Sequence, residues 1–136
     1  MTIFSKEEKA AMRATVAEKK AAKEGADAAA ACDAAIAALT GTDKELAEAF
    51  HELVAENTSL AAKTWYGMPA YADADGKIVV AFKPGSKFKI RYATLEFQQA
   101  ATLDDGNLWP VGFALTKMDD ADKKRIAAIL KAAVGV

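Results

Sequence analysis

The sequence predicts an α+β fold in which an antiparallel meander carries helices on one face. Alanine-rich and lysine-rich helical patterns fill the chain up to about residue 57. Segments rich in β-branched and aromatic residues follow, separated by short turns, and an amphipathic helical pattern closes the chain. Helices, then antiparallel strands, then a helix are the order expected of a sheet covered on one side.

The composition limits the classes of function. The 136 residues and the formal net charge of -1 fit one domain with no long-range attraction to nucleic acid or anionic lipid. No stretch approaches the roughly 18 apolar residues of a membrane span, and the first residues lack a signal peptide's apolar run. Cys32 is the single cysteine, so no intrachain disulfide forms. We expect a soluble cytoplasmic protein with neither a membrane nor a nucleic-acid partner.

The N-terminal part is expected to form two helices. Ser5 is a candidate cap for a helix over residues 5–23, and Gly25-Ala26-Asp27 offers a break with Asp27 as the next N-cap. The second helix then runs to a stop at Gly41. We therefore divide the chain into a helical N-terminal extension, 1–41, and an α+β domain, 42–136.

A third helix is predicted after residue 41, because the apolar residues recur there at the spacing of a core-facing stripe. Thr42 or Asp43 is expected to cap it. The stripe consists of Leu46, Phe50, Leu53 and Val54.

Strands are predicted at 77–83, 87–94 and 108–117. Pro84-Gly85-Ser86 reads as the hairpin turn between the first two, and Pro110 restricts the last to an edge or a bulge. Asp119 is expected to cap a final helix that ends before Gly135.

Several strings together carry a family likeness. They are W-Y-G-M-P-A-Y (65–71), G-K-I-V-V-A-F (76–82), K-F-K-I-R-Y-A-T (87–94) and L-D-D-G-N-L-W-P (103–110). In this order, over residues 46–134, the chain resembles the bacterial YdhG-like family. Some members of that family are described as frataxin-like intracellular iron chaperones, so the resemblance implies a frataxin-like α+β sandwich and a role in iron delivery.

An iron carrier holds its ion through oxygen ligands such as exposed carboxylates. The third helix offers an acidic stripe at i, i+3, i+7 and i+11, which is also the pattern of an ordinary solvated helix face. The candidate metal ligands are Glu45, Glu48, Glu52 and Glu56.

A second hypothesis is an anion or nucleotide-like ligand. In an extended segment 87–94 the side chains alternate, so that Phe88, Ile90 and Tyr92 face the core and the cations face outward. The candidate ligand-binding residues are the cations Lys87, Lys89 and Arg91 with the neighbouring Trp65, Tyr66, Met68 and Trp109. A third hypothesis is an interaction module whose N-terminal helices pair with another chain, and a homodimer is one such assembly.

The W-Y-G-M-P-A-Y string reads as a bent strand, because Gly67 permits unusual backbone angles and Pro69 removes a donor. We interpret it as a corner of the core beside a candidate pocket. His51 reads as a surface residue of a helix, and no nucleophile, base or phosphate loop is recognisable. The sequence therefore favours a binding protein over an enzyme.

Overall fold

The computed structural model describes residues 5–135. Within them lie three α-helices, one short 3-10 helix and a five-stranded sheet. The elements are α1 (Lys6–Ala37), α2 (Gly41–Asn57), β1 (Ala61–Trp65), β2 (Met68–Ala72), β3 (Ile78–Lys83), η1 (Ser86–Phe88), β4 (Ala93–Phe97), β5 (Gly112–Leu115) and α3 (Asp120–Ala133). Among these residues, no helix combines the length and the apolar character needed to cross a bilayer.

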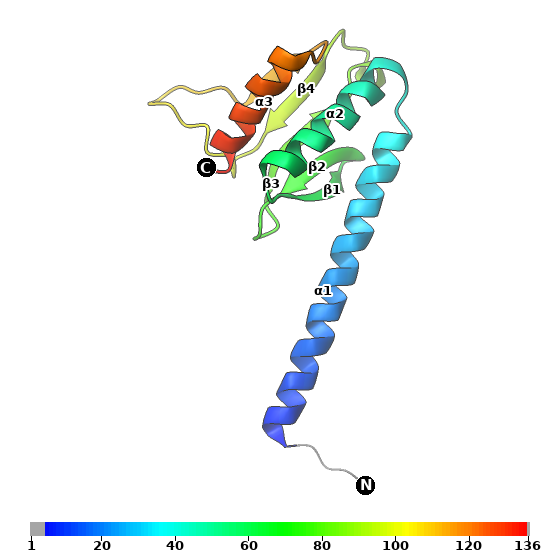
Figure 1. Cartoon of the computed structure of the whole chain (residues 1–136), viewed down its shortest axis with the longest axis vertical. Coiled ribbons are helices and arrows are strands. Elements are labelled where there is room, and N and C mark those ends of the chain that lie inside the picture. The colour runs from blue at the N-terminus through cyan, green and yellow to red at the C-terminus, as the bar shows by residue number, and fades with distance from the viewer. Residues whose placement is uncertain (1–4, 136) are drawn as a thin grey trace.

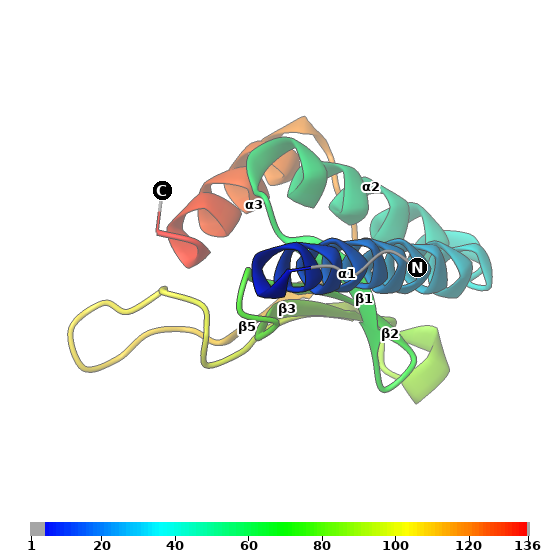
Figure 2. The same ribbon diagram turned by 90° about the horizontal axis from the view of Figure 1, so that it is seen from below.

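The predicted meander is confirmed. The strands pair antiparallel in the order β1-β2-β3-β4-β5, and the sheet stays open. Figure 2 shows α2 and α3 on one side of the sheet, with the last part of α1 beside β1. The opposite side, here called the open face, carries no helix of this layer.

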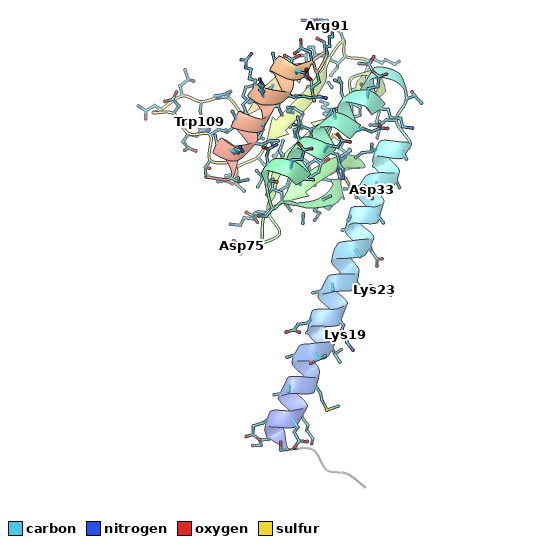
Figure 3. All side chains as sticks on the ribbon, viewed as in Figure 1. Lys19, Lys23, Asp33, Asp75, Arg91 and Trp109 are labelled. Carbon is cyan, nitrogen blue, oxygen red and sulfur yellow. The ribbon has the colours of Figure 1, made fainter. Side chains whose placement is uncertain are left out.

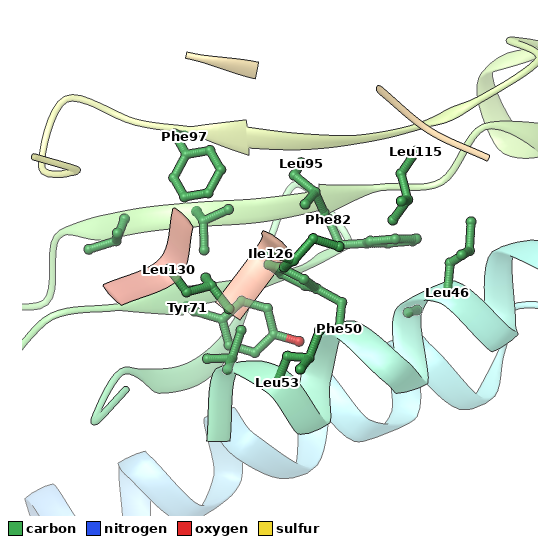
Figure 4. Close-up of a cluster of buried hydrophobic side chains, with 14 of the residues drawn as sticks. Leu46, Phe50, Leu53, Tyr71, Phe82, Leu95, Phe97, Leu115, Ile126 and Leu130 are labelled. Carbon is green, nitrogen blue, oxygen red and sulfur yellow. The ribbon is translucent and has the colours of Figure 1, made fainter. Parts of the chain in front are cut away.

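The core lies between the sheet and the helices. Phe50 on α2 packs edge-on against Tyr71, with ring centroids 5.6 Å apart, and lies 6.4 Å from the ring of Phe82. Figure 4 shows these rings surrounded by aliphatic side chains from α2, α3 and the central strands. The labelled members are Leu46, Phe50, Leu53, Tyr71, Phe82, Leu95, Phe97, Leu115, Ile126 and Leu130.

The predicted break in the N-terminal helices is wrong, since α1 continues through Gly25. A glycine inside a helix costs only about 1 kcal/mol relative to alanine, and strong helix formers flank this one. Residues 5–27 are all exposed, and Figure 1 shows this part of α1 extending away from the domain. The buried residues of α1 are Cys32 and Ile36, so its last turns belong to the core.

The predicted cap of α2 is also wrong. The N-cap residue is Thr40, and the carboxylate of Asp43 turns instead to a distant loop, where it accepts hydrogen bonds from the backbone N–H groups of Gly85 and Ser86 at 3.1 Å each. At α3 the prediction is confirmed. Asp119 accepts from the N–H of Asp122, and the Asp122 carboxylate accepts from the N–H of Asp119.

Two predicted strands are shorter than expected. Of 108–117, only Gly112–Leu115 forms a strand, and of 87–94 only the last two residues do. The segment after Pro84 instead folds into η1, where Phe88 and Ile90 both donate to the carbonyl of Gly85. Because Asp43 satisfies the N–H groups of Gly85 and Ser86, this backbone does not need a strand partner. The expected alternation of cations outside and Phe88, Ile90 and Tyr92 inside is therefore wrong.

Candidate functional site

The W-Y-G-M-P-A-Y string forms a tight hairpin between β1 and β2, and not a bent strand. Trp65 pairs with Met68, and the two-residue turn between them has φ of 51° at Tyr66 and 76° at Gly67. Positive φ at both positions is the signature of a type I′ turn, in which asparagine and glycine are favoured. Tyrosine at the first position is therefore unusual.

The aromatic rings of Trp65 and Tyr66 contact each other at this turn. Trp65 and Tyr66 meet edge to face with centroids 5.0 Å apart, and Tyr66 is 82% exposed. Trp65 packs on a small apolar cluster formed by Met68, Ala70 and Ala81. Since Ala70 alternates with Tyr71, whose side chain is in the helix-covered core, this cluster lies on the open face.

The η1 segment brings cations to the same hairpin. The Nζ of Lys87 lies 3.6 Å from the position that a Cβ on Gly67 would occupy. Two ammonium groups lie near the Phe88 ring, with Lys83 Nζ at 4.8 Å and Lys87 Nζ at 6.0 Å from its centroid. Figure 2 shows the β1–β2 hairpin and η1 next to each other on the side of the sheet away from α2 and α3.

We call this region the hairpin corner, defined by Trp65, Tyr66, Gly67, Met68, Lys83, Lys87 and Phe88. Lys83 is balanced by Glu96, 3.8 Å away, whereas Lys87 has no ion-pair partner among residues 5–135. A shallow hollow of about 610 Å³ adjoins Trp65 on the same face. Its lining is Trp65, Gly76, Lys77, Ile78, Gln98, Gln99 and Ala100.

Backbone strain marks the same corner. Tyr66 and Lys89 are the non-glycine residues with positive φ within the described chain, at 51° and 56°. This conformation costs an ordinary L-residue about 1–2 kcal/mol, and such outliers gather at functional sites. The first lies at the hairpin tip and the second follows η1 directly.

The other predicted ligand residues lie elsewhere. Arg91 stacks on Tyr92 at 5.3 Å and lines a hollow of about 360 Å³ with Thr42, Ser86 and Thr116. Trp109 lies on the loop before β5, and Figure 3 places it far from Arg91. The structure thus groups Trp65, Tyr66, Met68 and Lys87, whereas Arg91 lines a different hollow and Trp109 lies on the loop before β5.

The predicted acidic stripe is exposed along α2, at Glu45, Glu48, Glu52 and Glu56. Glu48 and Glu52 border a hollow of about 220 Å³ with Asp33, Ile36 and His51. Within residues 5–135, no three His, Cys, Asp or Glu side chains are grouped closely enough to hold a metal ion. The carboxylates are thus solvated individually.

No pattern in the sequence predicts the polar contacts beside this hollow, which join side chains of three elements. His51 Nδ1 lies 3.0 Å from the Tyr71 hydroxyl, and His51 Nε2 lies 3.6 Å from Asp33 Oδ1. Burial, reinforced by the neighbouring Cys32, raises the pKa of Tyr71, and burial also raises the pKa of the Cys32 thiol. Both groups stay protonated at neutral pH. The contacts among Asp33, His51 and Tyr71 link α1, α2 and β2 to one another.

Comparison of this chain with protein-family models, curated proteins and solved structures finds no match. The interpretation of the site therefore depends on its geometry.

Proposed function

We propose that the protein is a ligand-binding module of the YdhG-like family and that its hairpin corner binds a small anion attached to a planar ring. The observation that carries the proposal is the Lys87 ammonium, which has no carboxylate partner in the described chain and lies beside the strained, exposed Tyr66 turn. An unbalanced ammonium attracts a phosphate or carboxylate, and exposed aromatic rings stack on a planar group.

The expected affinity is modest. A hydrogen bond to a charged group contributes about 1.5–3 kcal/mol, and stacking on an aromatic side chain contributes about 1–3 kcal/mol. Together these give about 2.5–6 kcal/mol, and the middle of this range, about 4 kcal/mol, corresponds to a dissociation constant near 1 mM. Binding should also weaken as salt rises, because the corner is open to solvent.

The experiment uses Trp65 as the reporter in a Trp109→Phe background, so that fluorescence arises from the hairpin alone. Adenosine monophosphate supplies ring and anion, adenosine the ring, and inorganic phosphate the anion. We expect the monophosphate to change Trp65 emission at lower concentration than either fragment. Lys87→Ala should weaken this response, and Lys124→Ala, an exposed lysine on α3, is the matched control. An unchanged spectrum at about 10 mM monophosphate would remove the proposal.

The iron role implied by the YdhG-like resemblance is the second candidate. One observation favours it: Asp33, Glu48, His51 and Glu52 border one hollow and offer the oxygen and nitrogen donors that iron(II) accepts. These side chains are not grouped as a metal site, so the geometry supports the hairpin corner better. Anaerobic calorimetric titration with iron(II) tests this role. A heat of binding that is present in the parent and lost in Glu48→Ala and Glu52→Ala supports it, and the absence of heat in the parent excludes it.

A further inference from the structure

Strand β5 leaves a row of backbone groups without partners. It is the last strand of an open sheet. The N–H of Phe97 donates to the carbonyl of Val111 at 2.7 Å, which sets the alternation of hydrogen bonds along β4 and β5. Phe113 and Leu115 consequently bond to β4, whereas the N–H and C=O groups of Gly112 and Ala114 point outward. No backbone hydrogen bond within residues 5–135 uses these outward groups.

A groove between β5 and α3 runs along this free edge. It encloses about 140 Å³, close to the ~150 Å³ of a cavity that holds a benzene molecule, so it has room for an apolar side chain. Its walls are Leu95, Phe113, Ala114, Leu115, Ile126 and Ile129. Asp122 and Arg125 on α3 supply its charged rim.

Apolar side chains are also exposed just before β5. Leu108 is 86% and Val111 is 62% exposed, although both are large and apolar. Figure 2 shows the loop that carries them extending past the sheet on the β5 side. Exposed apolar residues beside an open strand edge are typical of an interaction surface.

We propose that β5 pairs antiparallel with β5 of a second copy of this chain across a two-fold axis at Phe113. The outward groups of Gly112 then bond to those of Ala114 in the partner copy, and each such pair exchanges two hydrogen bonds. Phe113 meets its own equivalent on the helix-covered face, and the exposed Val111 packs beside the other copy's Leu115. The two sheets become one continuous sheet.

Charge complementarity selects a second copy as the occupant. A two-fold axis at Phe113 sets the two α3 helices antiparallel across the joined grooves. Asp122 and Arg125 give the groove rim both an acid and a base, and a copy related by a two-fold axis presents these two charges in the reverse order. A rim of one charge would repel its own copy. The surface is distinct from the hairpin corner at the opposite end of the sheet, so the two proposals stand independently.

The pairing between the two β5 strands is short, because Pro110 lacks an N–H and ends the hydrogen bonds between the copies just before β5. We therefore expect a reversible dimer whose population rises with protein concentration. Sedimentation equilibrium on the full chain should give a mass that increases toward that of two chains.

Substitutions at the edge test this directly. Ala114→Pro removes an outward N–H and leaves the ladder to β4 intact, and Val111→Lys places a charge at an exposed position. Both should keep the monomer mass at concentrations where the parent is dimeric. Tyr66→Lys, which removes an exposed aromatic residue at the other end of the sheet, is the control and should dimerise like the parent. A monomeric parent at about 1 mM, or a dimeric Val111→Lys, would overturn the proposal.

A cross-link tests the register. Opposed residues of a non-hydrogen-bonded antiparallel pair have Cα atoms about 4.5 Å apart, within the span of a disulfide. Phe113→Cys should therefore form a disulfide-linked dimer on oxidation, whereas Val111→Cys, which faces Leu115 of the other copy, should cross-link much less. Cys32 is fully buried and does not compete. Equal cross-linking of the two variants would exclude a two-fold axis at Phe113.

Discussion

The left-handed backbone of Tyr66 allows stability and binding to be separated in one experiment. Tyr66→Ala and Tyr66→Asn both remove the ring that contacts Trp65, a contact of about 0.5–1.5 kcal/mol. The two variants differ in how well they tolerate φ of 51°, because asparagine adopts the left-handed region far more readily than alanine.

The expected difference follows from that angle. A left-handed conformation costs alanine about 1–2 kcal/mol, and asparagine avoids most of this cost. We expect the Asn variant to be more stable than the Ala variant by about 1 kcal/mol, which for a chain of this length is a difference of about 3–5 °C in Tm. The Asn variant should lie close to the parent, because the relieved strain offsets the lost ring contact.

Thermal and urea unfolding of the three proteins measure this difference, and monophosphate titrations of the same samples measure binding. Both variants should lose most of the response at the hairpin corner, including the variant whose stability is retained. Equal Tm values for Asn and Ala would refute the argument that residue 66 is strained. Retained binding in both variants would show that the Tyr66 ring takes no part in the site.

Further predictions concern the fold. Asp43→Ala should destabilise the chain by about 3 kcal/mol, because one buried and one partly buried backbone donor lose a charged acceptor, and Asp43→Asn, which keeps one acceptor oxygen, should lose about half as much in urea unfolding. Gly25→Ala should raise the helix content measured by circular dichroism, whereas Gly41→Ala should destabilise the chain, because Gly41 has φ of 58° and Gly25 has helical angles. Tyr71 stays protonated in the folded chain but ionises in the unfolded chain near its ordinary pKa of 10.0, so its contribution to stability should be full below pH 10 and should fall above it by about 1.4 kcal/mol per pH unit. Tyr71→Phe should remove this part of the alkaline loss, and an alkaline stability profile equal to that of the parent would contradict it.

Local patterns were sufficient to predict the regular elements. The apolar stripe of α2, the N-cap at Asp119 and the β-branched run of β3 each depend on neighbours a few residues away, and each appears in the structure as expected. The open meander follows from the short turns between such runs. By contrast, Gly25 shows that a potential break has no effect where the surrounding residues favour a helix strongly.

The errors arise where a distant residue decides the local structure. The segment 87–91 alternates like a strand, but Asp43, more than 40 residues earlier in the chain, binds the loop before it. In addition, a side chain on Gly85 would clash with the carbonyl oxygen of Tyr92, so only glycine fits at this point of the loop. The candidate site was only partly predicted, for the same reason. Lys87 lies next to the turn at Gly67, and no local sequence pattern indicates that these two loops are close in space.

The uneven anchoring of α1 has a consequence for motion within one continuous helix. Its last turns are held by Cys32 and Ile36, whereas residues 6–27 are stabilised by local interactions, namely their backbone hydrogen bonds, the Ser5 cap, the Lys20–Glu24 pair and the helix preference of alanine, lysine and glutamate. Amide hydrogens near the first turn should therefore exchange with deuterated water almost as fast as in a free peptide, while those near Cys32 should exchange only when the domain opens. The protection of amide hydrogens against exchange should consequently rise steeply along α1, from its first turn to its last.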